Sequence, residues 1–446
     1  MNRDKIMKRI LFILLIALSP LWSQSFDGTG LGLAGSYTVT SRGIDALSWN
    51  PANIALPRGN TLEINIASAN IALLNNAFSM NTYNRYFTHE GNPDTLLDSG
   101  EKRDFLNLIP ENYWRLNTDV SANVLGLAFN NFAMGMQVIS QGGIGFNKKP
   151  LEIGLYGENI TTDYQLQIPE QVQGSAYAAV KISFGYAYPF RLQQFFPKLD
   201  ARIQPVSIGI AVNYYLGIAV AEVQDSEILL HRFPAANDQD ETIKYGGKAA
   251  VRVAIPEEGM IPGRGRGFDF GIAGGYGSQL RFGIGFSNLG ASINWNYNTR
   301  MELHTISDSL KTADLIENGP ETATRTDTTM DIDAFSTPLP SVMRVGAAYY
   351  LKPEWLVMAE WQQGLNKAFG NSTTPRISVA TEYKVTQFFP VRAGIALGGK
   401  ESFLFSLGFG LHLAMFDLDY SFAMKNALWP THSEGLFQAV GMKFKL

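Results

Sequence analysis

The chain has 446 residues and a formal net charge of −4, and it is 46% hydrophobic but only 17% charged. The charged fraction lies below the roughly 25% that is usual for soluble domains, and the negative net charge argues against a nucleic-acid-binding surface. The sequence contains no cysteine, which excludes a disulfide scaffold, a thiolate metal site and a lipid anchor at the processing site.

The first 23 residues are predicted to be a secretory signal peptide. Four basic residues precede an apolar run from Ile10 to Leu18. That run has about half of the ~20 residues that a membrane-spanning helix needs, so it fits the apolar part of a signal peptide. Cleavage is expected near Ser23–Gln24, and removing a segment of net charge +3 leaves a mature chain of charge −7. We therefore expect export through the secretory pathway.

Residues 24–57 are rich in glycine and match neither a strand nor an amphipathic helix. Glycine lets the backbone bend there, and the proline near the end favours a rigid turn. Because the segment has little side-chain mass, Tyr37, Leu47 and Trp49 need another surface against which to be buried. The positions that stand out are Gly30, Gly32, Gly35, Asp45, Trp49, Asn50, Pro51 and Ala52.

A glycine-rich lead, an acidic residue and then an aromatic-Asn-Pro-Ala step, all just after a signal peptide, resemble the N-terminal plug of the FadL-like outer-membrane barrels. This family includes the long-chain fatty-acid transporters and the OmpP1- and PorV-type barrels, and an uncharacterised group of such barrels is closer still. The resemblance covers residues 25–57. It implies a barrel of 14 strands, with the plug positions named above acting in gating. It also implies a ligand that enters from outside and leaves when the plug shifts, often through a kinked strand. The family's ligand pocket has no motif in this sequence, so no substrate residue is carried over.

Downstream of Pro57, apolar residues alternate with small or charged ones, which is typical of β-strands whose two faces meet different environments. The pattern is clearest at 391–398, 402–411 and 415–422. A soluble sandwich also alternates, so the connections between strands have to distinguish the two architectures. Strands are predicted near 61–81, 117–129, 132–142, 174–188, 205–222, 243–255, 267–276, 280–288, 291–306, 341–351, 355–363, 375–385, 389–398, 402–411, 415–425 and 436–446.

Long polar connections tend to alternate with short ones, as in barrels that cross a membrane. The 28 Phe, 18 Tyr and 7 Trp fit aromatic girdles at two membrane interfaces. The final strand resembles the signal that outer-membrane assembly machinery reads, although it ends in Leu446 in place of an aromatic residue. The long connections are 82–116, 143–173, 223–242, 307–340, 364–374 and 426–435, the short ones include 130–131, 289–290, 352–353 and 386–387, and 189–204 and 256–266 are long on the expected short side.

Six charged residues lie on the same face of their predicted strands as the small residues, opposite the apolar face. A charge on the lipid-facing side would cost roughly 2–4 kcal/mol for Arg or Lys at mid-depth, so we expect these side chains to face the lumen and to be paired there. We also expect Asp45 to face one of the inward arginines, and Asn50 to hydrogen-bond to the backbone of the barrel wall. The six residues are Arg281, Arg344, Arg392, Asp417, Asp419 and Lys443.

Motifs for chemistry are weak. The spacing of Gly30, Gly32 and Gly35 matches a dinucleotide-binding motif, but a signal peptide takes the place of the preceding strand and no helix pattern follows. The phosphate-loop-like Gly394–Lys400 lacks the next Ser or Thr and fits a hairpin turn. The five histidines have no ligand spacing, and no hydrolase or metalloprotease motif is present. We therefore expect no enzyme activity, no cofactor and no metal.

Two connections have further interpretations. Region 307–340 carries seven acidic residues against two basic ones. Calcium binding is one interpretation, but the region lacks the spacing of a calcium loop, which favours a solvated outer loop. Ser99 to Arg115 predicts a short helix that rests on the outer leaflet, caps the barrel mouth or packs on neighbouring loops.

The sequence therefore predicts an all-β, antiparallel transmembrane barrel of 14–16 strands over residues 58–446, with residues 24–57 as a plug in its lumen. The expected location is the outer membrane of a diderm bacterium. The leading function is passage of small hydrophobic or amphipathic molecules. A PorV-like barrel that holds secreted cargo and a purely structural barrel are the alternatives. Expected partners are outer-membrane lipids with lipopolysaccharide, the barrel assembly machinery and a small hydrophobic ligand.

Overall fold

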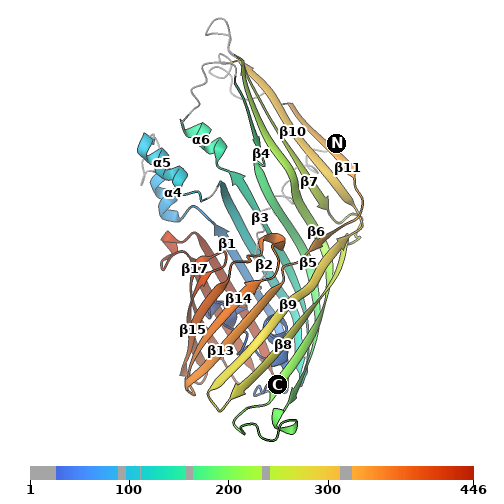
Figure 1. Ribbon diagram of the computed structural model, residues 1–446, viewed down its shortest axis with the longest axis vertical. Helices are drawn as coiled ribbons and strands as arrows, with labels where there is room; N and C mark the ends of the chain where they lie inside the picture. The colour runs from blue at the N-terminus through green and yellow to red at the C-terminus, as the bar shows by residue number, and fades with distance from the viewer. Residues whose placement is uncertain (1–26, 89–96, 111, 157–163, 234–241, 312–323) are drawn as a thin grey trace.

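The computed structural model describes residues 27–88, 97–110, 112–156, 164–233, 242–311 and 324–446, and the predicted signal peptide lies outside these ranges. Within them, fourteen strands close into an antiparallel barrel (Figure 1). In order around the barrel they are β1 (Leu62–Asn75), β2 (Tyr113–Phe129), β3 (Phe132–Asn147), β5 (Val172–Phe190), β6 (Val206–Phe233), β8 (Gly263–Tyr276), β9 (Leu280–Trp295), β13 (Val342–Lys352), β14 (Trp355–Gly364), β15 (Arg376–Thr386), β16 (Phe389–Gly398), β17 (Ser402–His412), β18 (Phe416–Lys425) and β19 (Gly435–Lys445). Because β1 pairs with both β2 and β19, the wall has no open edge.

The predicted antiparallel barrel is confirmed, at the lower end of the predicted strand number. The tight turn predicted at 289–290 is wrong, because these residues lie inside β9. Asn288 and Gly290 have positive φ of 57° and 61° there, and the pairing of β9 with β8 shifts register. An Asn and Gly close together supports a β-bulge as well as a hairpin turn, so the local sequence does not distinguish the two.

A second group of strands extends the wall upward on one side (Figure 1). It consists of β4 (Tyr164–Pro169), β7 (Thr242–Ala254), β10 (Thr299–Lys311), β11 (Thr324–Asp331) and β12 (Phe335–Pro338). β6 is 28 residues long, and it pairs with β8 in its lower half and with β7 in its upper half. The predicted strands 243–255 and 291–306 therefore do not each add a strand to the closed wall. The connection after β7 lies partway up the wall and not at the short end.

Three helices lie at the upper end, beside β1 to β3 (Figure 1). They are α4 (Met80–Tyr86), α5 (Ser99–Asn107) and α6 (Lys149–Tyr156), and the short 3-10 turns η3 (Leu192–Gln194) and η5 (Pro430–His432) lie in other connections. The helix predicted within Ser99–Arg115 is α5, which Asp98 and Glu101 cap reciprocally. Its Phe105 and Leu106 are buried against Tyr86 of α4, so the helix packs on its neighbours. No helix in the described part of the chain is long and apolar enough to span a membrane.

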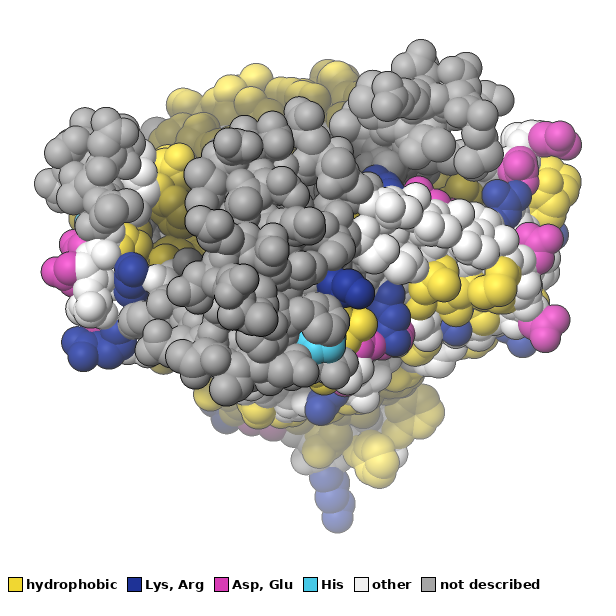
Figure 2. Space-filling model, turned by 90° about the horizontal axis from the view of Figure 1, so that it is seen from above, with side chains coloured by type: hydrophobic (Ala, Val, Ile, Leu, Met, Phe, Trp, Pro, Cys, Tyr) yellow, Lys and Arg dark blue, Asp and Glu magenta, His cyan; other side chains and the backbone are white. Residues whose placement is uncertain are grey.

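The outer face of the wall is apolar. In β6, Ile208, Ile210 and Val212 are exposed by 39%, 54% and 46%, whereas Ser207 and Asn213, of the opposite phase, are fully buried. The same alternation places Leu397 outside and Arg392 inside. Seen from above, Lys, Arg, Asp and Glu side chains are visible both at the edges and near the middle of the upper end (Figure 2). The wall therefore has an apolar exterior and a polar interior.

Candidate functional site

The N-terminal segment lies inside the barrel, in the lower half of Figure 1. It contains α2 (Gly28–Gly32), α3 (Ala46–Trp49) and the 3-10 turn η1 (Pro51–Ala55). α2 contacts β16 to β19, and η1 contacts β5, β6 and β8 on the other side of the wall. Residues 27–56, which we call the plug, therefore reach across the lumen, and most of their side chains are buried.

The wall carries glycine where the plug backbone touches it. A Cβ at Gly209 would lie 2.3 Å from the Ala52 nitrogen, and one at Gly285 would lie 2.6 Å from the Trp49 carbonyl oxygen. The plug therefore lies directly against the sheet, with no room for wall side chains. Sequence analysis missed these glycines, although they occupy the same phase as the inward charges. Gly126, Gly185, Gly271, Gly346 and Gly394 have similarly close plug neighbours.

The Asn50-Pro51-Ala52 step joins the plug to the wall. The Asn50 side chain donates from Nδ2 to the Ile272 carbonyl of β8 at 3.2 Å. Its Oδ1 accepts from the Ala52 backbone N–H at 3.1 Å, so Asn50 caps η1, with Pro51 in the first turn. All three residues are buried. The structure therefore places the step against β8.

The glycines of the predicted plug positions allow close packing. A Cβ at Gly30 would lie 2.5 Å from the Trp49 ring, and one at Gly32 would lie 2.5 Å from the Ser421 hydroxyl. Gly35 has φ of 79°, a conformation that L side chains rarely adopt. Trp49 packs edge-on against the Tyr37 ring at 5.6 Å.

A buried cluster of charges lies between the plug and β1 and β19. It consists of Asp27, Asp45, Glu63 and Lys443, and we call it the acidic cluster. Asp45 forms an ion pair with Lys443 and accepts a hydrogen bond from the Tyr37 hydroxyl at 3.0 Å. Glu63 accepts from a plug backbone N–H at 3.1 Å. The expectation that Asp45 faces an arginine is wrong, because the rotation of the plug in the lumen decides which strand it meets.

Asp27 holds two parts of the plug together. Its carboxylate accepts from the Gly30 backbone N–H at 2.6 Å and from the Trp49 indole N–H at 3.0 Å. Burial raises the pKa of Asp27 to about 7, and the nearby charge of Asp45 acts in the same direction. The protonation state of this plug carboxyl therefore changes near neutral pH.

The other predicted lumen charges lie at different heights. Arg392 pairs with Asp419 at 2.6 Å and with Glu382 at 2.7 Å. The Arg344 guanidinium lies 5.1 Å from the centre of the Trp49 ring. Arg281 donates to the Leu280 carbonyl, and Asp417 pairs with Lys445. The structure thus brings Arg344 and Lys443 to the plug and leaves Arg281 and Asp417 near the lower strand ends.

Two further wall residues bind the plug, and sequence analysis did not single them out. Arg376 donates to the Ala34 carbonyl at 2.8 Å, and it also pairs with the buried Glu401 at 3.3 Å. Glu360 accepts from both the backbone N–H and the hydroxyl of Thr38, at 2.9 and 3.0 Å. Their inward phase was visible in the sequence, but their partners were not.

A second obstruction crosses the lumen above the plug. It is the connection between β14 and β15, residues 365–375, which we call the crossbar and which contains η4 (Ala368–Gly370). Phe369 of the crossbar is buried against Tyr177 of β5, with ring centres 4.4 Å apart, and it joins an apolar cluster with residues of β3, β5, β6 and β9. β5 lies across the barrel from β14 and β15. The sequence predicts this segment only as a long polar connection at 364–374.

The crossbar is fixed at its base and strained at its tip. Asn366 donates to the Leu339 carbonyl at 2.8 Å, and Asn371 donates to the Ser341 carbonyl at 2.9 Å. Phe369 has φ of 41° and ψ of 44°, which is unfavourable for a bulky residue. Strain of this kind persists only where surrounding contacts impose it, and it is common at functional sites.

A polar cavity of about 610 Å³ lies beside the crossbar. Its lining contains four basic residues and no Asp or Glu: Arg115, Lys367, Lys400 and Lys425. An apolar hollow of about 380 Å³ shares Leu74 and Asn117 with this cavity. Both hollows are within the range of small-molecule sites. Among the described residues, no three His, Asp or Glu side chains gather as a metal site would require.

The fold and the filled lumen together define a plugged 14-stranded barrel. The family model described as "Family of unknown function (DUF5723)" matches residues 51–418, and the chain belongs to this family. The curated proteins contain no match.

Several solved structures are similar to this chain. The "TodX deltaS2S3 mutant monoaromatic hydrocarbon channel" is 12% identical, with a TM-score of 0.51, and the match covers 95% of this chain and 99% of that one. The Pseudomonas putida toluene transporter TodX is 11% identical over 94% and 97% of the two chains, with a TM-score of 0.47. A Pseudomonas aeruginosa FadL homologue is 12% identical over 96% and 98%, with a TM-score of 0.44. The match to the TodX mutant channel shows that this chain shares its fold, as the N-terminal resemblance implied.

Proposed function

We propose that this protein is an outer-membrane channel through which small hydrophobic or amphipathic molecules pass when the plug shifts. The observation that carries the proposal is a closed barrel whose lumen is obstructed at two heights, by the plug and by the crossbar. The apolar outer face supports insertion in a membrane, because a large exposed apolar surface is unfavourable in water. Export through the secretory pathway is part of the same proposal.

The two hollows above the plug support an amphipathic solute. One is polar and basic, the other is lined mainly by Leu, Met, Phe and Pro side chains, and they share Leu74 and Asn117. A molecule with a polar head and an apolar body therefore finds the two environments next to each other. Below them, separate hydrogen bonds of about 0.5–1.5 kcal/mol each hold the plug, so it can be released in steps.

Deleting residues 28–53 tests the channel. The deletion should leave a folded barrel that admits small solutes into proteoliposomes faster than the full chain. Asn50→Ala should lie between the two, because it removes the bond to the Ile272 carbonyl and the cap of η1. Unchanged influx together with an unchanged unfolding temperature in both variants would refute a gating plug.

The two alternative functions make different predictions in the same preparation. A barrel that holds secreted cargo should co-purify with protein and not with lipid-like molecules, and a structural barrel should co-purify with neither. Lipopolysaccharide and the barrel assembly machinery remain proposed partners, and the purification would show them as well.

A further inference from the structure

We propose that the polar cavity beside the crossbar binds the anionic head of the solute, and that this head carries at least two negative charges, as in a phosphate monoester or a diphosphate. The inference rests on the proposed channel, because a solute that enters from the upper end meets this cavity before the plug. Such a solute differs from the monoaromatic hydrocarbons after which the similar channels are named.

The charge of the lining carries the inference. Arg115 comes from β2, Lys367 from the crossbar, Lys400 from the β16–β17 turn and Lys425 from the end of β18. Three parts of the wall and the crossbar thus place basic side chains around one cavity of about 610 Å³, and its lining contains no Asp or Glu. The remaining lining is rich in Asn, Ser, Thr and Gly, whose hydroxyl, amide and backbone groups donate hydrogen bonds to anions.

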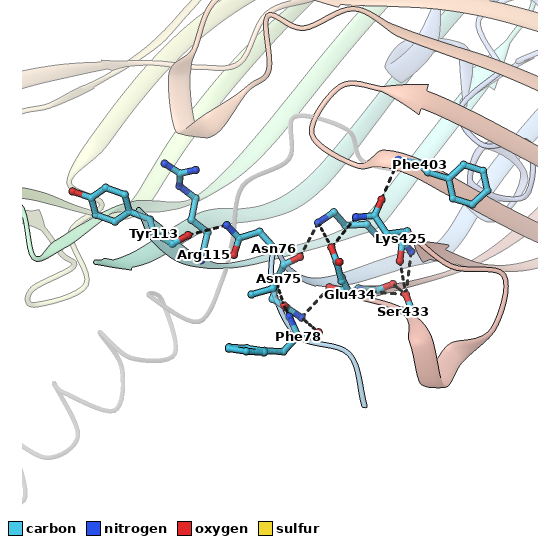
Figure 3. A network of polar contacts seen from close by, with 12 residues as sticks. Asn75, Asn76, Phe78, Tyr113, Arg115, Phe403, Lys425, Ser433 and Glu434 are labelled. Atoms are coloured by element: carbon cyan, nitrogen blue, oxygen red, sulfur yellow. Dashed lines mark hydrogen bonds and ion pairs between the residues drawn. The ribbon is translucent and has the colours of Figure 1, made fainter. Parts of the chain in front are cut away.

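A network of hydrogen bonds beside the cavity holds the Lys425 side chain and the Arg115 backbone in place (Figure 3). The Lys425 ammonium donates to the Asn75 carbonyl at 2.8 Å and pairs with Glu434 at 3.2 Å. Asn76 accepts from the Arg115 backbone N–H at 2.8 Å and donates to the Tyr113 carbonyl at 2.9 Å. The Arg115 side chain extends away from Asn75 and Asn76 in Figure 3, and its guanidinium lies 5.5 Å from the centre of the Tyr113 ring.

Lys400 and Arg115 line the same cavity, from the β16–β17 turn and from β2, so their like charges face a common space. Burial lowers the pKa of Lys400 to about 7; Glu401 opposes this shift, and the charge of Arg115 adds to it. Two cations from opposite segments that disfavour one another are stabilised by an anion between them. A head with two charges neutralises both, whereas a single carboxylate neutralises one. Four basic side chains around one cavity therefore favour a head with at least two negative charges.

The source of the phosphate is a soluble molecule and not the phosphates of lipopolysaccharide, because the cavity lies inside the barrel wall. The test uses the purified full-length chain in neutral detergent and measures binding by calorimetry with two probes, inorganic pyrophosphate and purified lipopolysaccharide. Pyrophosphate should bind, and its affinity should fall as salt is raised.

The double variant Arg115→Gln/Lys400→Gln should bind pyrophosphate about tenfold more weakly or worse. The matched control is Lys102→Gln/Arg103→Gln on α5, which makes the same charge change outside the cavity lining and should leave binding unchanged. Lys367→Gln is exposed on the crossbar, so it provides a second measurement if the double variant folds poorly. It should weaken binding several-fold.

Equal affinity in the cavity and control variants, absence of pyrophosphate binding, or binding of lipopolysaccharide alone would each overturn the inference. The plug deletion separates this result from failure of the channel. If the deletion raises influx but the full-length chain binds no pyrophosphate, the anion site is refuted and the channel is retained. If the cavity variants weaken pyrophosphate binding but the deletion leaves influx unchanged, the anion site is retained and the channel is refuted.

Discussion

The lower and upper parts of the lumen are filled in different ways. In the lower part, the plug packs on wall glycines, and its polar groups form hydrogen bonds with wall residues such as Glu360 and Arg376. Little space remains there. Above, the crossbar spans the lumen but leaves a cavity of about 610 Å³ lined by cations. The difference separates two tasks: close packing closes the barrel, whereas an open charged cavity can hold a solute.

Lys443→Met should give the largest loss of stability. Lys443 is the cation of the acidic cluster, and without it Asp45 and Glu63 remain buried beside each other. Removing one partner of a buried ion pair typically costs about 3–5 kcal/mol. The loss is measured as a fall in the urea midpoint of the purified barrel, and adding Asp45→Asn should recover much of it. Lys352→Met, at an exposed strand end, is the control; equal losses at both positions would contradict a role for the acidic cluster.

Much of the wall was predictable, because alternation is a local property. The inward phase of Arg392 and Asp419 follows from their apolar neighbours alone, and the resemblance of residues 25–57 implied both the plug and the strand number. The upward extension was not predictable. β7 and β10 alternate like wall strands, and only the length of β6, which pairs with β8 below and β7 above, moves them out of the closed barrel.

The contacts that the plug and the crossbar make across the lumen could not be predicted from the sequence, for a different reason. Which wall residue meets Asp45, or which strand Phe369 reaches, depends on how two segments far apart in the chain are oriented in space. A single sequence records the phase of a side chain but not the rotation of the plug. The wall glycines are the exception, because residues such as Gly283 and Gly285 repeat in the inward phase and so indicate a close backbone approach.

The second prediction concerns pH and the plug. The pKa of Asp27 is raised from 3.8 to about 7 by burial and by Asp45. A carboxyl with a higher pKa in the folded state stabilises that state when protonated, so this stabilisation is complete below about pH 4 and is lost as the pH rises to about 7. The slope is at most about 1.4 kcal/mol per pH unit. The unfolding midpoint should therefore fall over this interval, and Asp27→Asn should flatten that part of the profile. An unchanged profile in the variant would assign the dependence to other groups.

The third prediction tests the fit between plug and wall. Gly209→Ala places a methyl group 2.3 Å from the Ala52 backbone nitrogen, and backbone atoms have little room to move away. Overpacking of this kind costs about 1–3 kcal/mol, and it should displace the plug and raise solute influx. Gly59→Ala is the matched control, since a Cβ there has no neighbour within 4 Å. If both variants admit solute at the rate of the unchanged chain, the plug does not depend on close contact with β6.

The smallest effect distinguishes strain at the crossbar tip from ordinary packing. Phe369→Ala and Phe369→Gly both remove the ring that contacts Tyr177, so both should raise influx to a similar extent. They differ in backbone preference, because φ of 41° costs an L-residue about 1–2 kcal/mol and costs glycine almost nothing. Phe369→Gly should therefore be more stable than Phe369→Ala by about 1 kcal/mol. At Leu365, whose φ is not positive, the order should reverse. Urea midpoints of the four variants measure both differences, and an Ala variant more stable than the Gly variant at position 369 would show that the crossbar tip stores no backbone strain.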